Sequence, residues 1–375
     1  MKILYVTALV ETINTFLVPH IEMLIEKENI VECACNINTE IDKRLIDKNV
    51  KIHNVKFSRN PIKINYKKVI NQLRQLQEEN KYDIVHVHTP IAAFITRFSL
   101  RRYNCKIIYT VHGFHFYKGA SITNWITYYP LEYIAAKWTD IIITINREDY
   151  LNCNKLRLRG NNSKTFLVNG VGIDLDRYKI LSGKFNEKKR KELGFYKDDF
   201  LIIMIADLNK NKNQIQLINA IHLLKDQYYN IKAIIVGDGP MRKILENEIK
   251  SRKMENNIKL LGYRKDINEL INISNIGILL SYREGLPRNI MELMACGKPI
   301  IGTNIRGIRD LINDNINGYL VNLNDAKDTA NKIKILYNNQ CKVKYMGEKS
   351  LEYIKNYSLN EIINDLKSIY YLEGE

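Results

Sequence analysis

The fold of this chain is constrained most strongly by an alternation of short Ile/Val-rich runs with longer helical patterns. Short, nearly continuous apolar runs suit parallel strands that are buried on both faces. When each strand is followed by a helix, the pairs build a doubly wound α/β sheet. The runs are Lys2–Thr7, Val31–Cys35, Ile84–His88, Lys106–Thr110, Ile141–Ile145 and Lys164–Val168, then Leu201–Ala206, Ile231–Val236, Ile258–Leu261, Ile276–Leu280, Pro299–Gly302 and Gly318–Val321.

Length and composition favour two folded domains. The chain has 375 residues, and domains average roughly 100–200 residues. Hydrophobic residues make up 45% and charged residues 26%, which excludes a largely disordered or polytopic membrane protein. No stretch reaches the ~20 apolar residues of a membrane span, and we expect the first ten residues to form a strand, not a signal segment. Six scattered cysteines without a CxxC pair suggest reduced thiols and a cytoplasmic protein.

The net charge predicts an anionic partner. Lys and Arg number 57 against 41 Asp and Glu, which leaves +16. A nucleotide diphosphate, a phospholipid surface or a nucleic acid would each complement this charge. The excess is spread along the chain, without the cationic tail that is typical of nucleic-acid arms. We therefore expect a compact basic surface and no nucleic-acid partner.

The two halves are expected to meet near Asn169–Asp174. This segment has two glycines with turn-forming Asn and Asp, and the charged stretch Lys184–Lys191 that follows has little hydrophobic periodicity. If two open parallel sheets face each other, the carboxyl ends of both sets of strands border one crevice. The functional site is predicted there.

The segment Glu284–Pro299 is the strongest functional signal. A polar loop follows the run Ile276–Leu280, and Pro287 suits the first position of a helix. The amino end of such a helix would face the crevice, where its free N–H groups and dipole favour an anion. The carboxylates of Glu284 and Glu292 would accept hydrogen bonds from hydroxyls. A sugar diphosphate offers both groups; spacing alone leaves an ordinary βα unit with surface glutamates equally open.

The Glu-x7-Glu spacing of Glu284 and Glu292 resembles the donor-binding motif of the retaining, nucleotide-sugar-dependent glycosyltransferases of family four. Within that family the chain is most similar to bacterial enzymes that build capsule, exopolysaccharide or other surface glycans. Further segments agree in order over nearly the whole chain: Asp83–Pro90, Thr110–Phe114, Asn169–Asp174, Lys212-Asn213 and Val236–Pro240.

The resemblance implies a GT-B architecture, an α/β fold with two Rossmann-like doubly wound domains, an interdomain cleft and a last helix that crosses back to the first domain. The expected domains are an acceptor-binding domain at 1–172, a nucleotide-sugar-binding domain at 173–352, and the returning helix at 353–375. The helical apolar pattern of Leu359–Tyr371 fits that last helix.

The resemblance also implies roles for particular residues. Glu284 would bind the sugar hydroxyls, Glu292 the ribose hydroxyls and Lys212 the diphosphate. His112 would face the reacting centre, although a lone histidine after a strand is often purely structural. The backbone N–H groups after Glu284 belong to Gly285 and Leu286, and the residues expected on the acceptor side are His88, Thr89 and Phe114.

Two departures from the family pattern affect the donor site. The family usually has a glycine-rich loop after the first strand, but Thr7–Thr15 contains no glycine. The usual arginine before the phosphate lysine is Asp207 here, which removes a charge-assisted hydrogen bond of about 1.5–3 kcal/mol. Lys210 and Arg288 are the candidates to replace it.

We expect neither a metal nor a cofactor. His86, His88, His112 and His115 have ligand-like spacing, but no nearby carboxylate or thiolate completes a closed site. The family resemblance assigns Asp174-x-Asp176 to the interdomain segment and not to a metal. A dinucleotide loop is also excluded, because Gly237–Pro240 lacks the third glycine of GxGxxG.

The aromatic segment 116–138 and the nearby Arg97, Arg101 and Arg102 predict an acceptor surface. An aromatic and cationic rim could hold a polyprenyl-diphosphate-linked sugar at the inner face of the cell membrane. The alternative is that these aromatic residues simply pack a helix onto the sheet.

These features predict a retaining, metal-independent glycosyltransferase that moves a hexose or N-acetylhexosamine from a nucleoside-diphosphate sugar, preferably a UDP-sugar. The acceptor would be a growing, lipid-linked bacterial surface glycan. Two alternatives stay open: a sugar-nucleotide 2-epimerase of the same architecture, and a noncatalytic basic module that binds membrane or RNA.

Overall fold

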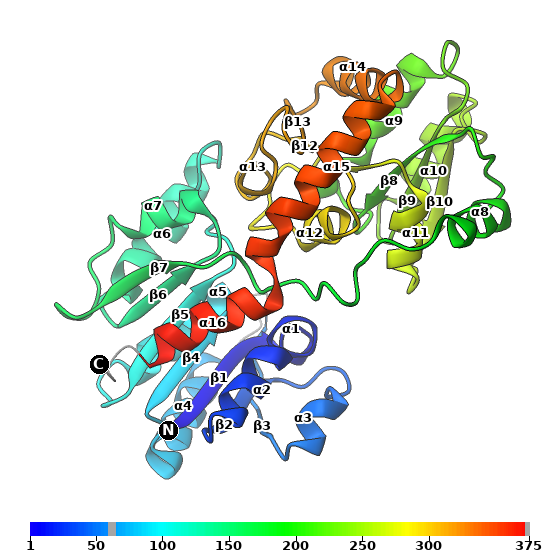
Figure 1. Cartoon of the computed structure of the whole chain (residues 1–375). Helices are drawn as coiled ribbons and strands as arrows, with labels where there is room; N and C mark the ends of the chain where they lie inside the picture. Colours follow the sequence, from blue (N-terminus) through cyan, green and yellow to red (C-terminus); the bar gives the residue numbers. More distant parts are fainter. Residues whose placement is uncertain (59–64, 372–375) are drawn as a thin grey trace. The chain divides into compact units, whose positions relative to one another are not determined.

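The computed structural model describes residues 1–58 and 65–371. The chain forms two compact units. Unit 1 contains Met1–Val171 and the chain from Ile362 onward, and unit 2 contains Gly172–Glu361. Figure 1 shows the elements of both units, which are described separately. The last four residues of the predicted segment 353–375 lie outside the described residues.

Unit 1 is built on a seven-stranded sheet in which all pairs are parallel. The strand order is β3-β2-β1-β4-β5-β6-β7. The order reverses between β1 and β4, and ligands of open α/β sheets bind at the carboxyl ends of strands at such a switch point. The strands are β1 Lys2–Leu9, β2 Ile30–Asn36, β3 Lys51–Asn54, β4 Ile84–His88, β5 Lys106–Val111, β6 Ile141–Thr144 and β7 Lys164–Leu167.

Helices cover the sheet of unit 1 (Figure 1). The last helix, α16, buries Ile362, Leu366 and Ile369 in the same hydrophobic cluster as Ile3 of β1. The predicted crossing of the last helix back to the first domain is thereby confirmed. The helical elements of this unit are α1 Val10–Thr12, the π-helix η1 Ile13–Leu17, α2 Val18–Glu26, α3 Lys43–Asp47, α4 Tyr66–Asn80, α5 Pro90–Leu100, α6 Ile122–Ala136, α7 Arg147–Cys153 and α16 Leu359–Tyr370.

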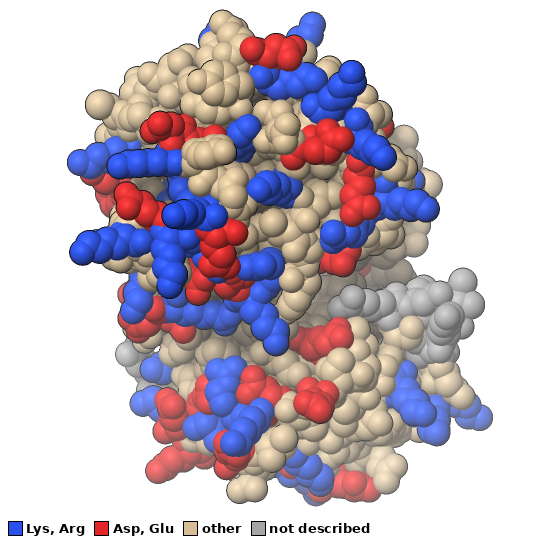
Figure 2. Space-filling view, turned by 90° about the vertical axis from the view of Figure 1, so that its right-hand side faces the viewer, with Lys and Arg blue, Asp and Glu red and all other residues tan. Residues whose placement is uncertain are grey.

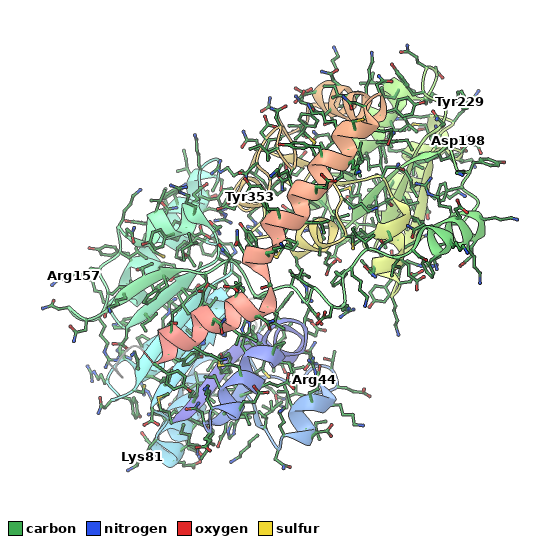
Figure 3. The ribbon with its side chains drawn as sticks, in the orientation of Figure 1. Arg44, Lys81, Arg157, Asp198, Tyr229 and Tyr353 are labelled. Carbon is green, nitrogen blue, oxygen red and sulfur yellow. The ribbon has the colours of Figure 1, made fainter. Side chains whose placement is uncertain are left out.

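Unit 2 has a six-stranded parallel sheet in the order β10-β9-β8-β11-β12-β13. Its switch point lies between β8 and β11. Asp198 and Tyr229, labelled in Figure 3, lie just before the amino ends of β8 and β9, opposite the carboxyl ends that border the switch point. The strands are β8 Phe200–Ile205, β9 Ile231–Val236, β10 Ile258–Gly262, β11 Ile276–Leu279, β12 Ile300–Thr303 and β13 Gly318–Val321.

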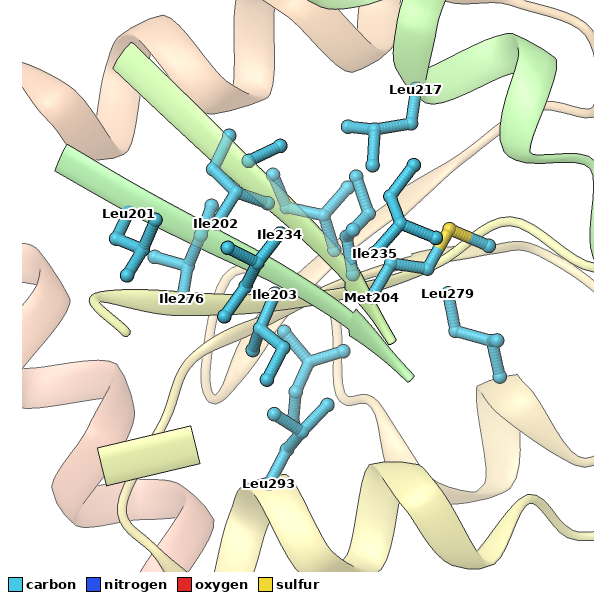
Figure 4. Close-up of a cluster of buried hydrophobic side chains, with 14 of the residues drawn as sticks. Leu201, Ile202, Ile203, Met204, Leu217, Ile234, Ile235, Ile276, Leu279 and Leu293 are labelled. Carbon is cyan, nitrogen blue, oxygen red and sulfur yellow. The ribbon is translucent and has the colours of Figure 1, made fainter. Parts of the chain in front are cut away.

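The core of unit 2 lies on both faces of its sheet. Figure 4 shows Leu217 and Leu293 approaching the strands from opposite sides. A Cβ atom on Gly277 would lie 2.4 Å from the Leu293 side chain, so glycine in β11 lets Leu293 and its helix sit close to the sheet. The helical elements are α8 Gly183–Glu192, η3 Lys210–Lys212, α9 Gln214–Leu224, α10 Arg242–Ser251, α11 Ile267–Ile273, α12 Arg288–Ala295, α13 Ile308–Leu311, α14 Ala326–Tyr337, α15 Gln340–Ile354 and η4 Lys355–Tyr357.

Each predicted Ile/Val run overlaps an observed strand, so the prediction of two doubly wound α/β halves is confirmed. Strand β3 was missed, because its sequence KIHN lacks an apolar run and pairs with only one neighbour, β2. The low hydrophobic periodicity of Lys184–Lys191 gave no sign of the helix that the structure shows there. This stretch lies in α8, which is held by polar contacts: Lys189 Nζ lies 2.8 Å from carboxylates of both Asp266 and Glu269.

The surface carries both signs of charge. Figure 2 shows Lys and Arg interspersed with Asp and Glu over the visible face, so the excess of positive charge is not gathered in one patch there. Within residues 1–58 and 65–371, no helix is both long and apolar enough to cross a bilayer.

Candidate functional site

Two predicted donor-site residues meet at the switch point of unit 2. Lys212 ends the short helix η3 after β8, and Glu284 lies in the loop after β11. Lys212 Nζ donates a hydrogen bond to Glu284 Oε1 at 2.6 Å, and both side chains are largely buried. The structure therefore brings a cation and a carboxylate to the sheet edge where α/β folds bind ligands.

Asn211 ties these two loops together. Its carbonyl accepts a hydrogen bond from the Tyr282 N–H at 2.8 Å, and its side-chain amide donates to the Arg283 carbonyl at 2.9 Å. Asn209 caps η3 by accepting a hydrogen bond from the Lys212 N–H at 3.2 Å. The backbone that carries Lys212 is therefore held on both sides.

Arg306, which the sequence analysis missed, supports the Glu284 loop. It lies between β12 and α13, is only 4% exposed, and donates from Nε to the Glu284 carbonyl at 3.1 Å. The next residue, Gly307, has φ +78°, and a Cβ atom there would lie 2.2 Å from the Gly285 carbonyl oxygen. The sequence signal that could have identified this residue is the pair Arg306-Gly307 in the loop after β12.

Glu292, on α12, lies in a second polar cluster of unit 2. Its Oε1 is 3.4 Å from Arg288 Nε, and it accepts a hydrogen bond from the Tyr178 hydroxyl. Burial raises the pKa of Glu292, although the Tyr178 hydrogen bond and the Arg288 charge oppose this shift. Tyr178 was not predicted from the sequence. Arg288, proposed as a phosphate ligand, is paired with Glu292, whereas Lys210 is exposed.

The helix after Glu284 begins one residue later than predicted. Pro287 is the N-cap, with extended ψ of 115°, and α12 starts at Arg288. Gly285 and Leu286 are in the loop that leads into this helix. At the other end of the segment, Lys298 Nζ donates to the carbonyls of Asn272 and Ser274, and burial lowers its pKa to about 8.

The segment Gly237–Pro240 packs against the loop after β8. A Cβ atom on Gly237 would lie 2.1 Å from the Ala206 carbonyl oxygen, and one on Gly239 would lie 2.6 Å from that of Leu208. The glycines are therefore needed where two backbones approach closely. Asp207, at the position of the family's usual arginine, is exposed between those contacts.

In unit 1, His112 and His88 contact each other. They follow or end the neighbouring strands β5 and β4, and His88 Nδ1 lies 3.1 Å from His112 Nε2. Burial lowers the pKa of His112 to about 4, and the pKa of His88 also lies well below its ordinary value. Both imidazoles are consequently neutral near pH 7.

The other two histidines with ligand-like spacing, His86 and His115, have structural partners. His86 lies 2.5 Å from the Tyr370 hydroxyl and 2.7 Å from the Thr110 hydroxyl, and the His115 ring stacks on Tyr128. In the described part of the chain, no three His, Cys, Asp or Glu residues form a group that could hold a metal ion.

Two predicted acceptor-side residues are internal. Phe114 is 3% exposed and stacks on Phe116 in the hydrophobic core, and the His88 side chain is also buried. Thr89 lies nearer the sheet edge. It has φ +61°, and its Oγ1 accepts a hydrogen bond from the Ala8 N–H at 3.0 Å. A β-branched residue at positive φ is a strained conformation.

The glycine-free segment Thr7–Thr15 does not form a loop. Strand β1 runs to Leu9, the helix α1 begins at Val10, and the π-helix η1 follows. Val10, Ile13 and Leu17 are buried. The chain at this switch point therefore passes directly from strand to helix.

Arg97 does not belong to a cationic rim on unit 1. It is fully buried, donates to Glu132 at 2.8 Å and lies over the Tyr109 ring at 4.1 Å. Arg101 is partly exposed against the Phe98 ring, and Arg102 is exposed. Of these three arginines, only Arg101 and Arg102 reach the surface.

Comparison with known proteins places these observations in a family. The model for glycosyl transferases group 1 matches residues 185–353, and the glycosyl transferase 4-like model matches residues 2–146. EpsD of Bacillus subtilis (strain 168), named as a glycosyltransferase, is 34% identical over 305 residues, which cover 80% of each chain.

Two further comparisons agree. An Escherichia coli UDP-Gal:alpha-D-GlcNAc-diphosphoundecaprenol alpha-1,3-galactosyltransferase is 29% identical, covering 79% of this chain and 75% of its own. The crystal structure of Anabaena HepE in complex with UDP has a TM-score of 0.80 at 20% identity, with 99% of both chains covered. The chain therefore belongs to the group 1 glycosyl transferases, of the family-four-like type, and has the GT-B fold.

Proposed function

We propose that this glycosyltransferase moves a hexose or N-acetylhexosamine from a UDP-sugar to a hydroxyl of a lipid-linked bacterial surface glycan, with retention of anomeric configuration. The observation that carries this proposal is the contact of Lys212 with Glu284 at the switch point of unit 2. The Escherichia coli relative, whose name specifies a UDP-galactose donor and a diphosphoundecaprenol-linked acceptor, supports the choice of substrates.

The chemistry of the leaving group favours this arrangement. As the bond between sugar and diphosphate breaks, negative charge develops on UDP, and fixed positive charge stabilises it. Lys212 supplies that charge, together with the N–H groups at the start of α12. Because a carboxylate has about four acceptor sites, Glu284 can hold Lys212 and still accept from sugar hydroxyls. Glu292 is assigned to the ribose hydroxyls.

We assign His112 a neutral role at the reacting centre. Burial lowers its pKa to about 4, so near pH 7 the ring offers one N–H donor and one acceptor, not a positive charge. Its contact with His88 restricts the orientation of the ring. The acceptor hydroxyl then attacks the anomeric carbon from the face that UDP leaves, its proton passes to an oxygen of the departing diphosphate, and no covalent nucleophile is assigned.

Metal independence is part of the proposal. Asp174 of the Asp-x-Asp segment is engaged in a turn, where its carboxylate accepts from the N–H groups of Asp176 and Arg177 at 2.9 and 3.1 Å. The expected result is full transfer in EDTA. Activity that EDTA abolishes and Mn²⁺ restores would contradict this part of the proposal.

The main test is a panel of UDP-, GDP- and ADP-sugars. A bound donor raises thermal stability by mass action, so one UDP-sugar should raise the unfolding temperature more than the others do. Adding acceptor to the enzyme with that UDP-sugar should then release UDP. Formation of the 2-epimer from UDP-sugar alone would favour the epimerase alternative. Absence of both binding and turnover for every nucleotide sugar would favour a noncatalytic module.

Retention is tested separately. The anomeric coupling constants of the purified product, measured by NMR, should match those of the donor sugar. A product of opposite configuration would leave glycosyl transfer standing but overturn the retaining mechanism.

A further inference from the structure

The outer surface of helix α6 in unit 1 is unusually apolar. Ile122 and Ile126 are one helical turn apart and are 76% and 69% exposed. Large exposed apolar patches on folded domains mark interaction sites. We call the exposed apolar residues that share one side of this helix, at spacings i, i+3, i+4 and i+11, the α6 face: Ile122, Trp125, Ile126 and Tyr133.

Lysines flank the α6 face, and a carboxylate also lies beside one of them, because Glu148 accepts a hydrogen bond from the Lys118 N–H at 2.6 Å. The helix has one acidic residue, Glu132, and this side chain is turned inward onto the buried Arg97 at 2.8 Å. Exposed lysines flank the helix: Lys118 precedes it, and Lys137 follows it with Nζ 5.3 Å from the Tyr133 ring. Trp and Tyr are enriched at membrane–water interfaces, and lysines beside them attract anionic headgroups.

The α6 face is connected by ring contacts to the segment that carries His112. Phe114 stacks on Phe116 with centroids 4.4 Å apart, and Phe116 contacts Trp125 at 5.5 Å. The Arg97–Glu132 pair also joins α6 to α5. The helix is therefore firmly placed on unit 1, a short distance along the chain from the proposed reacting centre.

We propose that the α6 face inserts into the interfacial region of an anionic phospholipid bilayer, with Ile122 and Ile126 among the acyl chains and Lys118 and Lys137 at the phosphates. The proposal rests on the proposed function, because the membrane is where a lipid-linked acceptor resides. At 15 residues, α6 is suited to lie in the interface and not to span the bilayer. A second copy is a poorer occupant, because a symmetric contact would oppose lysines to lysines.

The test is cosedimentation of the full chain with vesicles of phosphatidylcholine and phosphatidylglycerol. Ile122→Glu/Ile126→Glu should lower the partition coefficient at least about tenfold, since two apolar side chains can no longer be buried. The matched control is Ile46→Glu on α3, on another side of unit 1 (Figure 1), where an isoleucine is 56% exposed. This control should bind as the unmodified chain does.

Charge is tested with Lys118→Gln/Lys137→Gln. This variant should lose most of the difference in binding between phosphatidylglycerol-containing and pure phosphatidylcholine vesicles, and added salt should have less effect on it. All variants should keep the same UDP-induced rise in unfolding temperature, which shows that they fold. If UDP raises the unfolding temperature of none of them, the proposed function fails. The vesicle result would still show whether the α6 face binds a bilayer.

Three results would overturn the α6 proposal. They are an unmodified chain that stays in the supernatant, a double isoleucine variant that sediments as much as the unmodified chain, and a dimer that the double variant dissociates. The last outcome would identify the α6 face as a contact between two copies of this chain.

Discussion

Lys212 Nζ lies 2.6 Å from Glu284 Oε1, although 72 residues separate them in sequence. The two loops that carry these side chains follow β8 and β11, which are neighbours in the sheet. The pair therefore joins the two sides of the switch point in unit 2. Replacing each residue on its own tests what the cation and the carboxylate contribute to donor binding.

Lys212→Ala should weaken UDP binding about 10- to 100-fold, because a charge-assisted hydrogen bond to phosphate contributes about 1.5–3 kcal/mol. Glu284→Gln should reduce transfer strongly and leave UDP affinity within a few-fold. Isothermal titration with UDP and an initial-rate assay measure these effects. Lys250→Ala, an exposed lysine at the end of α10, is the control. Equal loss of UDP affinity in Glu284→Gln would show that the carboxylate acts only by holding Lys212.

Lys210→Ala tests what replaces the arginine that is absent at Asp207. Lys210 is exposed next to Lys212, whereas the other candidate, Arg288, is paired with Glu292. We therefore expect Lys210→Ala to weaken UDP binding more than Arg288→Ala does, although less than Lys212→Ala. Titrations with UDP measure the order, and unchanged affinity in Lys210→Ala would eliminate this lysine as the replacement.

Tyr178→Phe should change the pH dependence of donor binding. A protonated Glu292 accepts fewer hydrogen bonds, so UDP affinity should fall as the pH is lowered through its raised pKa. The Tyr178 hydrogen bond lowers that pKa, so its removal should shift the midpoint to higher pH. Affinity measured between pH 4 and 8 tests this, with the exposed Tyr196→Phe as control. Superimposable curves for Tyr178→Phe and the unmodified chain would refute it.

Gly307→Ala should destabilise unit 2 and displace the Glu284 loop. The new Cβ atom would lie 2.2 Å from the Gly285 carbonyl oxygen, at a φ of +78°. Strained φ alone costs about 1–3 kcal/mol, and UDP affinity should fall as well. Urea denaturation and titration measure both effects. Gly183→Ala, where no atom lies within 4 Å, should be nearly neutral.

His112→Ala should remove transfer, while the protein stays folded and binds UDP as the unmodified chain does, at a somewhat lower unfolding temperature because the contact with His88 is lost. The matched control is the exposed His222→Ala on α9. An initial-rate assay with the donor identified above provides the measurement. Normal turnover by a folded His112→Ala protein would exclude this residue from the reacting centre.

Acid should destabilise unit 1. Burial lowers the pKa of His20 and His112 from 6.5 to about 4, so the unfolded chain binds protons at a higher pH than the folded unit. The stabilisation is complete above about pH 6.5 and is lost as pH falls toward 4, by up to about 1.4 kcal/mol per pH unit for each histidine. Urea denaturation at several pH values measures the slope. His20→Gln should reduce it, and an unchanged slope would contradict the assignment.

Much of the fold was predictable from the sequence because local patterns record burial. The run IVHVH of β4 is entirely buried, and α16 buries Ile362, Leu366 and Ile369, as the apolar pattern of Leu359–Tyr371 predicts. Burial left no such pattern in β3 or α8, which are held by an edge pairing and by ion pairs. A periodicity of apolar residues carries no information about contacts of that kind.

The candidate site shows the same division. The sequence by itself determined that Glu284 precedes a helix at the end of a strand and that Lys212 follows another strand. Only the tertiary structure decided that the two side chains touch, that Tyr178 reaches Glu292 and that Arg306 supports the Glu284 loop. These contacts depend on the order in which strands pair, and strand order arises from long-range packing that no local pattern encodes.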